Sequence, residues 1–289
     1  MNRLHKIVFP AAGMGTRFLP ATKATPKEML TIVDKPLIQY GVEEALAAGL
    51  DEVVMVTGRG KRSIEDHFDV SYELERALRD KGKTALYARV SEISHMAEIA
   101  YVRQREPLGL GHAVACAEHW VSDESFGVSL ADELIVSKVP AMRQLRDVYE
   151  RTGCSVIALA RVPREQSRRY GMVAAEPEGE LLRLTSMVEK PEPEDAPSDL
   201  AMIGRYIFTP RLFDYLRGAS AGTGGEIQLT DAIAELARHE PVYGVVIEGD
   251  RFDAGQPLGF LLANLNLGLR HADYGDSLRQ ALSSLLAAS

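Results

Sequence analysis

Short apolar runs alternate with segments of helical periodicity along the first 160 residues of the chain. The runs are rich in β-branched residues, as buried strands are, and we predict strands at 6–11, 52–57, 99–103, 126–130 and 155–160. Helical patterns between them predict helices at 36–48, 63–68, 72–81, 111–121 and 140–152. Strands of nearly continuous apolar sequence that alternate with helices are typical of a mostly parallel sheet with helices on both faces.

The alternation becomes less regular after residue 160. Strands predicted at 171–175, 181–188 and 202–208 suggest a small accessory β region on the main sheet. A helix at 226–238 and a strand at 242–247 are predicted to follow. Leucines at helical spacing run from residue 257 almost to the last residue. We therefore predict an α/β fold with one domain over 1–289. It has a Rossmann-like, mixed but mostly parallel sheet, and its residues 257–289 form a helical tail.

Composition and charge narrow the functional class. With 46% apolar and 26% charged residues, the chain is typical of a soluble globular protein. Its net charge of −8 is the wrong sign for a protein that binds DNA or an anionic membrane. No apolar run approaches the ~20 residues that span a bilayer. The two cysteines lack metal-ligand spacing, so we expect no structural zinc. From the charge and the lack of a spanning segment, we expect a cytoplasmic protein with no nucleic-acid or membrane partner.

Positive charge is concentrated near the first predicted strand. Residues 1–35 hold six Lys or Arg residues against two acidic ones. Gly13 and Gly15 follow the strand, where their backbone N–H groups favour a phosphate, although a tight βα turn would also explain two glycines. A dinucleotide-binding turn needs a third glycine where Phe18 stands. Arg17 and Lys27 beside the loop suit a triphosphate better than a dinucleotide.

Five motifs, in order along nearly the whole chain, resemble those of the sugar-nucleotide pyrophosphorylases. They are AAGMGTRFLPATKATPKEML (11–30), VTGRGKRSIEDHFD (56–69), LGLGHAVACA (108–117), VSLADELI (128–135) and GEIQLTDAI (225–233). More narrowly, the chain is similar to the bacterial UTP–glucose-1-phosphate uridylyltransferases. The resemblance implies a nucleotidyltransferase-type fold and transfer of uridylyl from UTP to α-D-glucose 1-phosphate, giving UDP-glucose and pyrophosphate. It also implies Mg²⁺ as cofactor and a homodimer or homotetramer.

Nucleotidyl transfer needs positive charge more than acid–base chemistry. A sugar 1-phosphate is already mostly a dianion at pH 7, so the obstacle is repulsion between two anionic phosphates. The resemblance implies that Arg17 and Lys27 hold the β- and γ-phosphates. It also implies that Asp132 binds Mg²⁺, which takes one or two protein carboxylates, with Asp253 as a second metal carboxylate. Without the resemblance, Asp132 is interpreted as a solvated carboxylate at the end of a strand.

For the sugar, the resemblance implies that Lys190 binds the phosphate and Glu189 the hydroxyl groups, with Gly171 and Gly204 beside the ring. Lys190 and Glu189 are adjacent, so on a regular strand they would point to opposite faces. We therefore predict that the chain turns at this point, as Pro191 favours.

For the nucleotide, the resemblance implies a pocket built from the glycine loop and two later segments. Gln104 and the backbone of Gly109 resemble the uracil-reading pair, since an amide can both donate and accept hydrogen bonds. The neighbouring His112 is interpreted as a packing position at the start of a helix. The complete predicted set is Ala12, Gly13, Gly15, Thr16, Glu28, Gln104 and Gly109.

Two other functions stay open. A thymidylyltransferase would share these residues, because uracil and thymine differ by one methyl group, worth only ~1–3 kcal/mol in a pocket. A catalytically silent paralogue that binds sugar nucleotides would be expected to lack one of Arg17, Lys27, Asp132 and Lys190, and all four are present. The leucine face at 258–269 predicts a contact between subunits, or else packing on its own domain.

Overall fold

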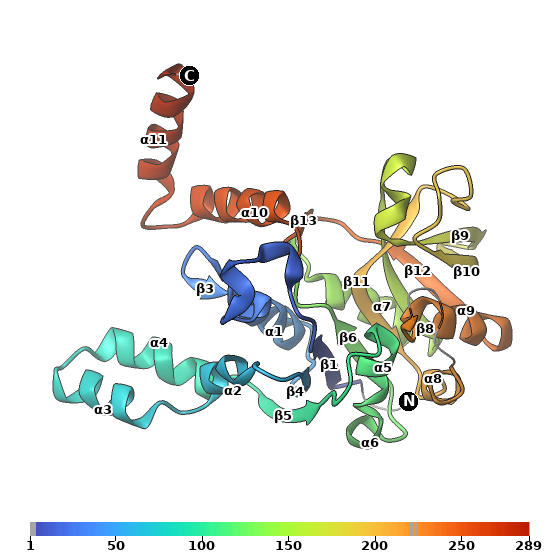
Figure 1. Cartoon of the computed structure of the whole chain (residues 1–289), viewed down its shortest axis with the longest axis horizontal. Coiled ribbons are helices and arrows are strands. Elements are labelled where there is room, and N and C mark those ends of the chain that lie inside the picture. The colour runs from blue at the N-terminus through green and yellow to red at the C-terminus, as the bar shows by residue number, and fades with distance from the viewer. Residues whose placement is uncertain (1–3, 220–221, 223–224, 289) are drawn as a thin grey trace.

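Nine strands form one sheet in the computed structural model, which describes residues 4–219, 222 and 225–288 (Figure 1). The strand order across the sheet is β5 (Glu98–Arg103), β4 (Glu52–Thr57), β1 (Lys6–Ala11), β6 (Phe126–Ser129), β11 (Leu200–Phe208), β8 (Ser155–Arg161), β12 (Val242–Val246), β10 (Leu181–Glu189) and β9 (Gly171–Glu178). The predicted α/β fold with a mixed sheet is confirmed.

The sheet is parallel in one half and mixed in the other. β1 pairs in parallel with β4 and β6, β4 pairs in parallel with β5, and β8 pairs in parallel with β12. β11 is antiparallel to both β6 and β8, and β10 is antiparallel to β9 and β12. Parallel pairing is thus less extensive than predicted. The expected accessory strands β9, β10 and β11 belong to the main sheet. β11 is the middle strand of the nine, and all nine of its residues are buried.

Helices cover both faces of the sheet. One face packs against α1 (Leu37–Ala47), α2 (Arg62–Phe68) and α7 (Ala141–Thr152), and the other packs against α5 (Leu110–Ala115), α6 (Glu118–Val121), α8 (Leu212–Arg217) and α9 (Leu229–His239). Alternate residues of β1 enter the two cores, with Ile7 and Phe9 on the first face and Val8 on the second. Both faces of the strand are therefore buried, which explains its continuous apolar sequence.

Two helical segments differ from the prediction. A helix pair is formed by α3 (Tyr72–Asp80) and α4 (Thr84–Ser94). α4 was not predicted, although Leu86, Val90 and Ile93 repeat at helical spacing, and none of its residues is buried. The predicted helix at 111–121 is divided into α5 and α6. The division lies where Ala117 donates its N–H to Val114, three residues earlier, which tightens the chain.

Two short ribbons, which the sequence did not predict, lie outside the main sheet. β2 (Thr31–Ile32) pairs with β3 (Lys35–Pro36), and β7 (Glu133–Val136) pairs with β13 (Asp250–Asp253). The register of the second ribbon sets Asp253 opposite Glu133. Asp253 therefore arrives next to the turn that carries Asp132, although 121 positions separate them in the chain.

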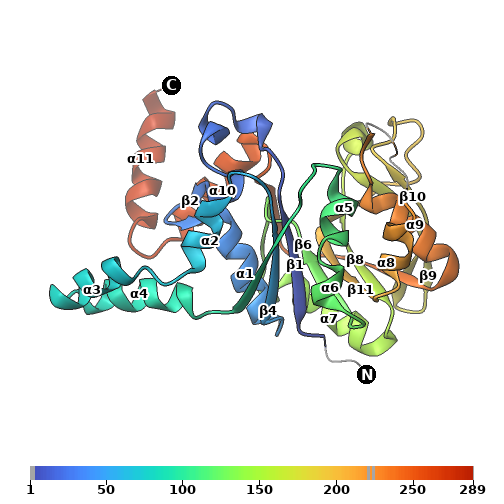
Figure 2. The same ribbon diagram turned by 60° about the horizontal axis from the view of Figure 1, so that its bottom comes forward.

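The tail consists of two helices, α10 (Pro257–Arg270) and α11 (Gly275–Ala288), and its final residue Ser289 lies outside the described part of the chain. Figures 1 and 2 both place α11 and the α3–α4 pair at one end of the molecule, away from β9 and β10. Within the described ranges, no helix has the length and apolar character needed to cross a bilayer.

Candidate active site

A cavity of about 480 Å³ lies among the turn after β6, the ends of β9 and β10, and the start of α9. It brings together seven of the predicted site residues, namely Arg17, Asp132, Gly171, Glu189, Lys190, Gly204 and Asp253. Its four basic side chains are matched by four acidic ones: Arg17, Arg168, Arg169 and Lys190 against Asp132, Glu133, Glu189 and Asp253. The lining is therefore close to neutral, so two phosphate groups would need further positive charge.

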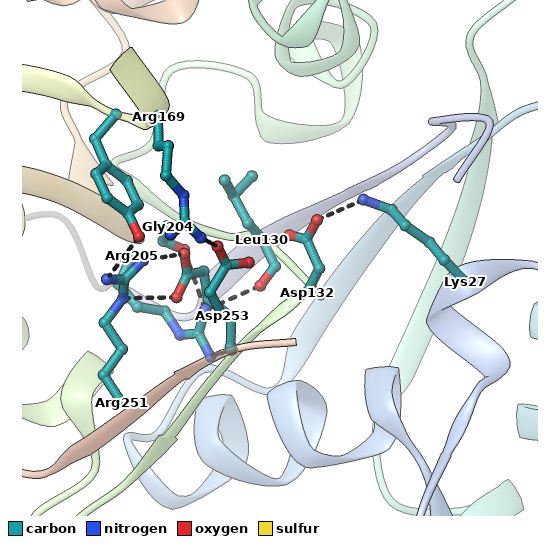
Figure 3. Close-up of polar contacts among 10 residues, drawn as sticks. Lys27, Leu130, Asp132, Arg169, Gly204, Arg205, Arg251 and Asp253 are labelled. Atoms are coloured by element: carbon teal, nitrogen blue, oxygen red, sulfur yellow. Dashed lines mark hydrogen bonds and ion pairs between the residues drawn. The ribbon is translucent and has the colours of Figure 1, made fainter. Parts of the chain in front are cut away.

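Lys27 lies outside this lining but contacts it through Asp132. Its Nζ donates to Asp132 Oδ2 at 2.5 Å, and each side chain is 22% exposed (Figure 3). Burial disfavours both charges, but their mutual attraction is stronger: Asp132 raises the pKa of Lys27, and Lys27 lowers the pKa of Asp132. Arg17 is close enough for its charge to act on both groups. Asp132 is therefore ionised, as a metal ligand must be.

The geometry around Asp132 fits a divalent cation. A Cβ added at Gly255 would meet Asp132 Oδ2 at 2.8 Å and Asp253 Oδ1 at 3.2 Å, so two carboxylate oxygens converge beside a residue without a side chain. Each carboxylate is neutralised by a basic side chain, Asp132 by Lys27 and Asp253 by Arg169. Within the part of the chain that the structure describes, no group of three or more His, Cys, Asp or Glu residues could hold a metal. Mg²⁺ needs only one or two carboxylates because phosphates and water complete its octahedron.

Close packing against Lys27 explains the second glycine of the loop, Gly15, whereas a Cβ at Gly13 would come no closer than 3.9 Å to Lys27. Gly15 has a left-handed backbone (φ 65°), and a Cβ there would lie 3.1 Å from Lys27 Cβ. Thr22 donates to the Gly15 carbonyl at 2.7 Å, and Thr16 begins a 3-10 turn that contains Arg17. The loop therefore places its backbone, Arg17 and Lys27 on one side of the site.

Glu189 and Lys190 both reach the cavity because the chain turns between them. β10 ends at Glu189, and Lys190 has a left-handed backbone with φ 45°. Lys190 Nζ lies 3.0 Å from Glu189 Oε1, while Thr230 donates to Glu189 Oε2 at 2.6 Å. Only about half of the Lys190 side chain is buried, so its ammonium remains available to an anion.

Gly204 and Gly171 line the cavity, but the space that a side chain would need at each is occupied by other residues of the protein. Gly204 has φ 48°, and a Cβ there would lie 2.8 Å from Glu133 Cγ and 3.1 Å from Leu130 Cβ. A Cβ at Gly171 would lie 3.0 Å from Thr230 Oγ1. The absence of a side chain at Gly204 therefore makes room for the turn that carries Asp132, which the sequence did not reveal.

The predicted base-reading residues form a second group beside the cavity. Gln104 follows β5, is buried, and donates through Nε2 to the Gly109 carbonyl at 3.1 Å. Leu110, the next residue after Gly109, lines the cavity itself. Ala12 follows β1 and packs against Gly58 at the end of β4, where a Cβ would lie 3.0 Å from its carbonyl oxygen. The three segments meet because the carboxyl ends of parallel strands lie at one edge of a sheet.

Glu28 is buried beside this group and is held by a residue that the sequence analysis missed. Lys61 donates to Glu28 Oε2 at 2.6 Å, and both side chains are buried. Burial raises the pKa of Glu28, although the charge of Lys61 opposes the shift. Among the described residues, none hydrogen-bonds its second oxygen, Oε1. Lys61 lies within the second motif, at 56–69, which was the available signal.

Other residues missed by the sequence analysis bind the acidic side chains of the cavity, among them Arg251 and Arg169 (Figure 3). Arg251 donates to Glu133 at 2.6 and 2.8 Å and lies over the Tyr170 ring at 4.8 Å. Burial raises the pKa of Glu133, and the hydrogen bonds from Arg251 offset part of that shift. Arg169 forms an ion pair with Asp253. Thr230, on Glu189, belongs to the fifth motif.

Comparisons with known proteins identify the family of the chain. The model of the nucleotidyl transferase family matches residues 6–268. A UTP–glucose-1-phosphate uridylyltransferase of Bacillus subtilis (strain 168) is 49% identical over 287 residues, covering 99% of this chain and 98% of the relative. A second one from the same strain, YngB, is 48% identical over 286 residues, covering 99% and 96%.

Solved structures are similar over the same length. A UDP-glucose pyrophosphorylase complexed with UDP-glucose superposes with a TM-score of 0.85 at 42% identity, covering 93% of this chain and all of that one. A UTP-bound enzyme of the same kind from Acinetobacter baumannii superposes with a TM-score of 0.90 at 38% identity, covering 98% of this chain and 100% of the other. The chain therefore belongs to the nucleotidyl transferase family, within its UTP–glucose-1-phosphate uridylyltransferases.

Proposed function

We propose that the protein transfers the uridylyl group of UTP to α-D-glucose 1-phosphate, forming UDP-glucose and pyrophosphate. The observation that carries the proposal is the cavity in which Lys190 and Glu189 face Asp132, Asp253 and Arg17. This arrangement supplies separate contacts for a sugar phosphate and for a triphosphate. Relatives that share the fold at 38–49% identity include proteins described with UTP and with UDP-glucose bound.

The residues act mainly by positioning and by charge. The phosphate dianion of the sugar attacks the α-phosphorus of UTP in line, and the bond from that phosphorus to the bridging oxygen of pyrophosphate breaks. Lys190 holds the attacking phosphate, and Glu189 accepts hydrogen bonds from the sugar hydroxyls. Arg17 and Lys27 bind the β- and γ-phosphates and stabilise the charge that grows on the leaving pyrophosphate. No side chain has to remove a proton, because the nucleophile is already ionised.

Asp132, with Asp253, would hold the divalent cation, which we propose to be Mg²⁺. When bound, the cation neutralises phosphate charge and orients the reacting oxygens. The basic and acidic side chains that line the cavity are equal in number, so the lining alone has no excess positive charge. The charge of the cation would therefore offset the repulsion between the two anionic substrates. Binding of the metal and of the phosphates also gives Asp132 and Lys27 new partners, so their ion pair is expected to open as the substrates bind.

Pyrophosphate release tests this proposal. With glucose 1-phosphate and Mg²⁺, we expect release from UTP, slower release from dTTP, and none after chelation of divalent metal. Faster turnover of dTTP than of UTP would favour the thymidylyltransferase alternative, and no release from any nucleotide would favour the silent paralogue. Asp132→Asn should keep the fold and lower kcat by about 10²–10³-fold. Near-normal turnover of Asp132→Asn would place the metal elsewhere.

We also propose that the single domain assembles into a homodimer or homotetramer through its tail. Leu258, Leu261, Leu262 and Leu265 on α10 are 39–69% exposed, and Leu285 and Leu286 on α11 are 66% and 77% exposed. Packing on the same domain therefore does not cover these leucines, and exposed apolar surface of this kind can mark a protein–protein contact. Light scattering at micromolar concentration should give a dimer or larger, and a double Leu285→Glu, Leu286→Glu variant a smaller species. A monomeric wild-type protein would contradict the proposal.

A further inference from the structure

A histidine behind the base-reading residues has no part in the proposed mechanism. His112 lies in the first turn of α5, and its Nδ1 is 3.0 Å from Nε2 of Gln104. The same Gln104 nitrogen lies 3.1 Å from the carbonyl oxygen of Gly109. An amide nitrogen carries two hydrogens, so these two contacts account for both of them.

The orientation of the Gln104 amide follows from the chemistry of its neighbours. A carbonyl oxygen only accepts hydrogen bonds, so the side of the amide that faces Gly109 must be the NH₂ group. With the amide reversed, two oxygens would face each other at hydrogen-bond distance. The second amide hydrogen then points at His112, whose Nδ1 must be the unprotonated, accepting nitrogen. The ring proton is left on Nε2, which lies 4.0 Å from the sulfur of Cys116.

Backbone packing fixes the Gly109 carbonyl independently of Gln104. Gly109 has φ 102°, and a Cβ there would lie 2.8 Å from both Glu226 Cβ and the Ile227 carbonyl oxygen. Ile227 donates its N–H to Leu108 at 2.7 Å and accepts from Gly111 at 2.9 Å. The segment that carries Gly109 and His112 is therefore held on both sides of Gly109. Gln104 is 9% exposed, so the amide meets two anchors with little room to rotate.

We infer that His112 is a positioning residue that holds the Gln104 amide with its oxygen free to read the base. None of the described residues donates a hydrogen bond to Gln104 Oε1. Uracil and thymine present a donor at N3, which suits an oxygen, whereas N3 of cytosine is an acceptor and would be opposed by it. His112 therefore sets the preference for UTP over CTP, an inference that rests on the proposed function and on Gln104 as the base reader.

Two nearly isosteric substitutions test this inference. His112→Asn keeps an oxygen that can accept from the Gln104 amide, whereas His112→Leu has the same shape and no acceptor. With glucose 1-phosphate and Mg²⁺, the ratio of kcat/KM for UTP to that for CTP should fall by about tenfold or more in His112→Leu and stay near the wild-type value in His112→Asn. The loss should appear in the KM for UTP rather than in kcat. The UTP-to-dTTP ratio should not change, because both bases carry a hydrogen on N3.

Cys116→Ala is the matched control, since it removes the neighbour of Nε2 and leaves the Nδ1 contact intact. An unchanged UTP-to-CTP ratio in His112→Leu, or an equal loss in His112→Asn, would overturn the inference.

A measurement on the wild-type protein avoids any dependence on folding of the variants. ¹⁵N NMR of histidine-labelled protein should show neutral His112 with its proton on Nε2, and a proton on Nδ1 would refute the inference. If the wild type released no pyrophosphate from UTP, the proposed function would fail. The NMR measurement of the His112 tautomer would still show whether Nδ1 accepts a hydrogen bond from Gln104.

Discussion

A methyl group at position 255 should separate the two carboxylates that we assign to the metal. In Gly255→Ala, the new Cβ would lie 2.8 Å from Asp132 Oδ2, whereas ordinary contact begins at 3.4 Å, so this oxygen must recede by the difference of 0.6 Å. Mg²⁺ demands near-ideal octahedral geometry, and metal–ligand distances vary by only about 0.2 Å. The displacement is therefore about three times larger than the metal site tolerates, and misplacement on this scale costs about 10²-fold in rate.

The fold should survive this substitution. Asp132 Oδ2 is the end of a side chain that is 22% exposed, so the carboxylate can rotate away. The main cost is the hydrogen bond from Lys27, about 1.5–3 kcal/mol for a charged partner. The reduced freedom of the unfolded chain offsets about 0.4–1 kcal/mol of it. We therefore expect a loss of about 0.5–2.6 kcal/mol in the free energy of unfolding, together with a large loss of activity.

Steady-state rates at increasing Mg²⁺ concentration measure this effect. Gly255→Ala should need more Mg²⁺ and reach a lower kcat, while its circular dichroism spectrum stays that of the wild type. Gly218→Ala is the matched control because Gly218 has φ −92° and the nearest atom to its added Cβ is 4.0 Å away. Activity of Gly255→Ala within threefold of the control at low Mg²⁺ would refute the two-carboxylate site.

Three further substitutions test the division of roles within the cavity. Lys190→Ala should raise the KM for glucose 1-phosphate by about tenfold or more and leave the KM for UTP nearly unchanged, because the lost charge faces the sugar phosphate. Equal effects on both substrates would place Lys190 on the triphosphate. Glu189→Gln should reduce the selection of glucose 1-phosphate over galactose 1-phosphate in competition assays, since an amide weakens charge-assisted hydrogen bonds. Unchanged selection would show that Glu189 does not bind the sugar hydroxyls. Arg17→Ala should lower kcat by about 10²–10³-fold, and a rise in the KM for UTP alone would make Arg17 a ground-state binder.

Local patterns predicted the elements that are buried on both faces. The bounds of β1 and β4 match the prediction to the residue, since each is a short apolar run that begins at a charged residue, Lys6 in β1 and Glu52 in β4. The missed elements lack such a pattern: α4 buries no residue, and β7 has only four residues, with a partner more than a hundred positions away. Pairing of that kind depends on tertiary structure that no local window contains.

The candidate site shows the same limit. The resemblance located seven residues that now line the cavity. The first and fourth motifs bring Arg17 and Asp132 there because they follow β1 and β6, parallel strands whose carboxyl ends lie at one edge of the sheet. The motifs did not reveal which cation neutralises which carboxylate, as the pairs of Lys27 with Asp132 and Arg169 with Asp253 show. Both pairs join segments that are distant in sequence. Their geometry depends on the ribbon of β7 and β13, which the sequence did not predict.

Arg205 explains how the turn that carries Asp132 is held in place. Its guanidinium is fully buried and donates to the carbonyl of Leu130 at 3.0 Å (Figure 3) and to that of Glu133 at 2.8 Å, one on each side of Asp132. It also donates to the carboxylate of Glu44 at 2.9 Å. Stability alone does not account for such a pair, because apolar replacement of a buried ion pair is often neutral or favourable by about 1–4 kcal/mol. An apolar side chain cannot, however, donate to two backbone carbonyls that flank one residue. The carboxylate that we propose for the metal needs a rigid surrounding shell. We therefore infer that the buried charge of Arg205 serves the position of Asp132 more than the stability of the fold.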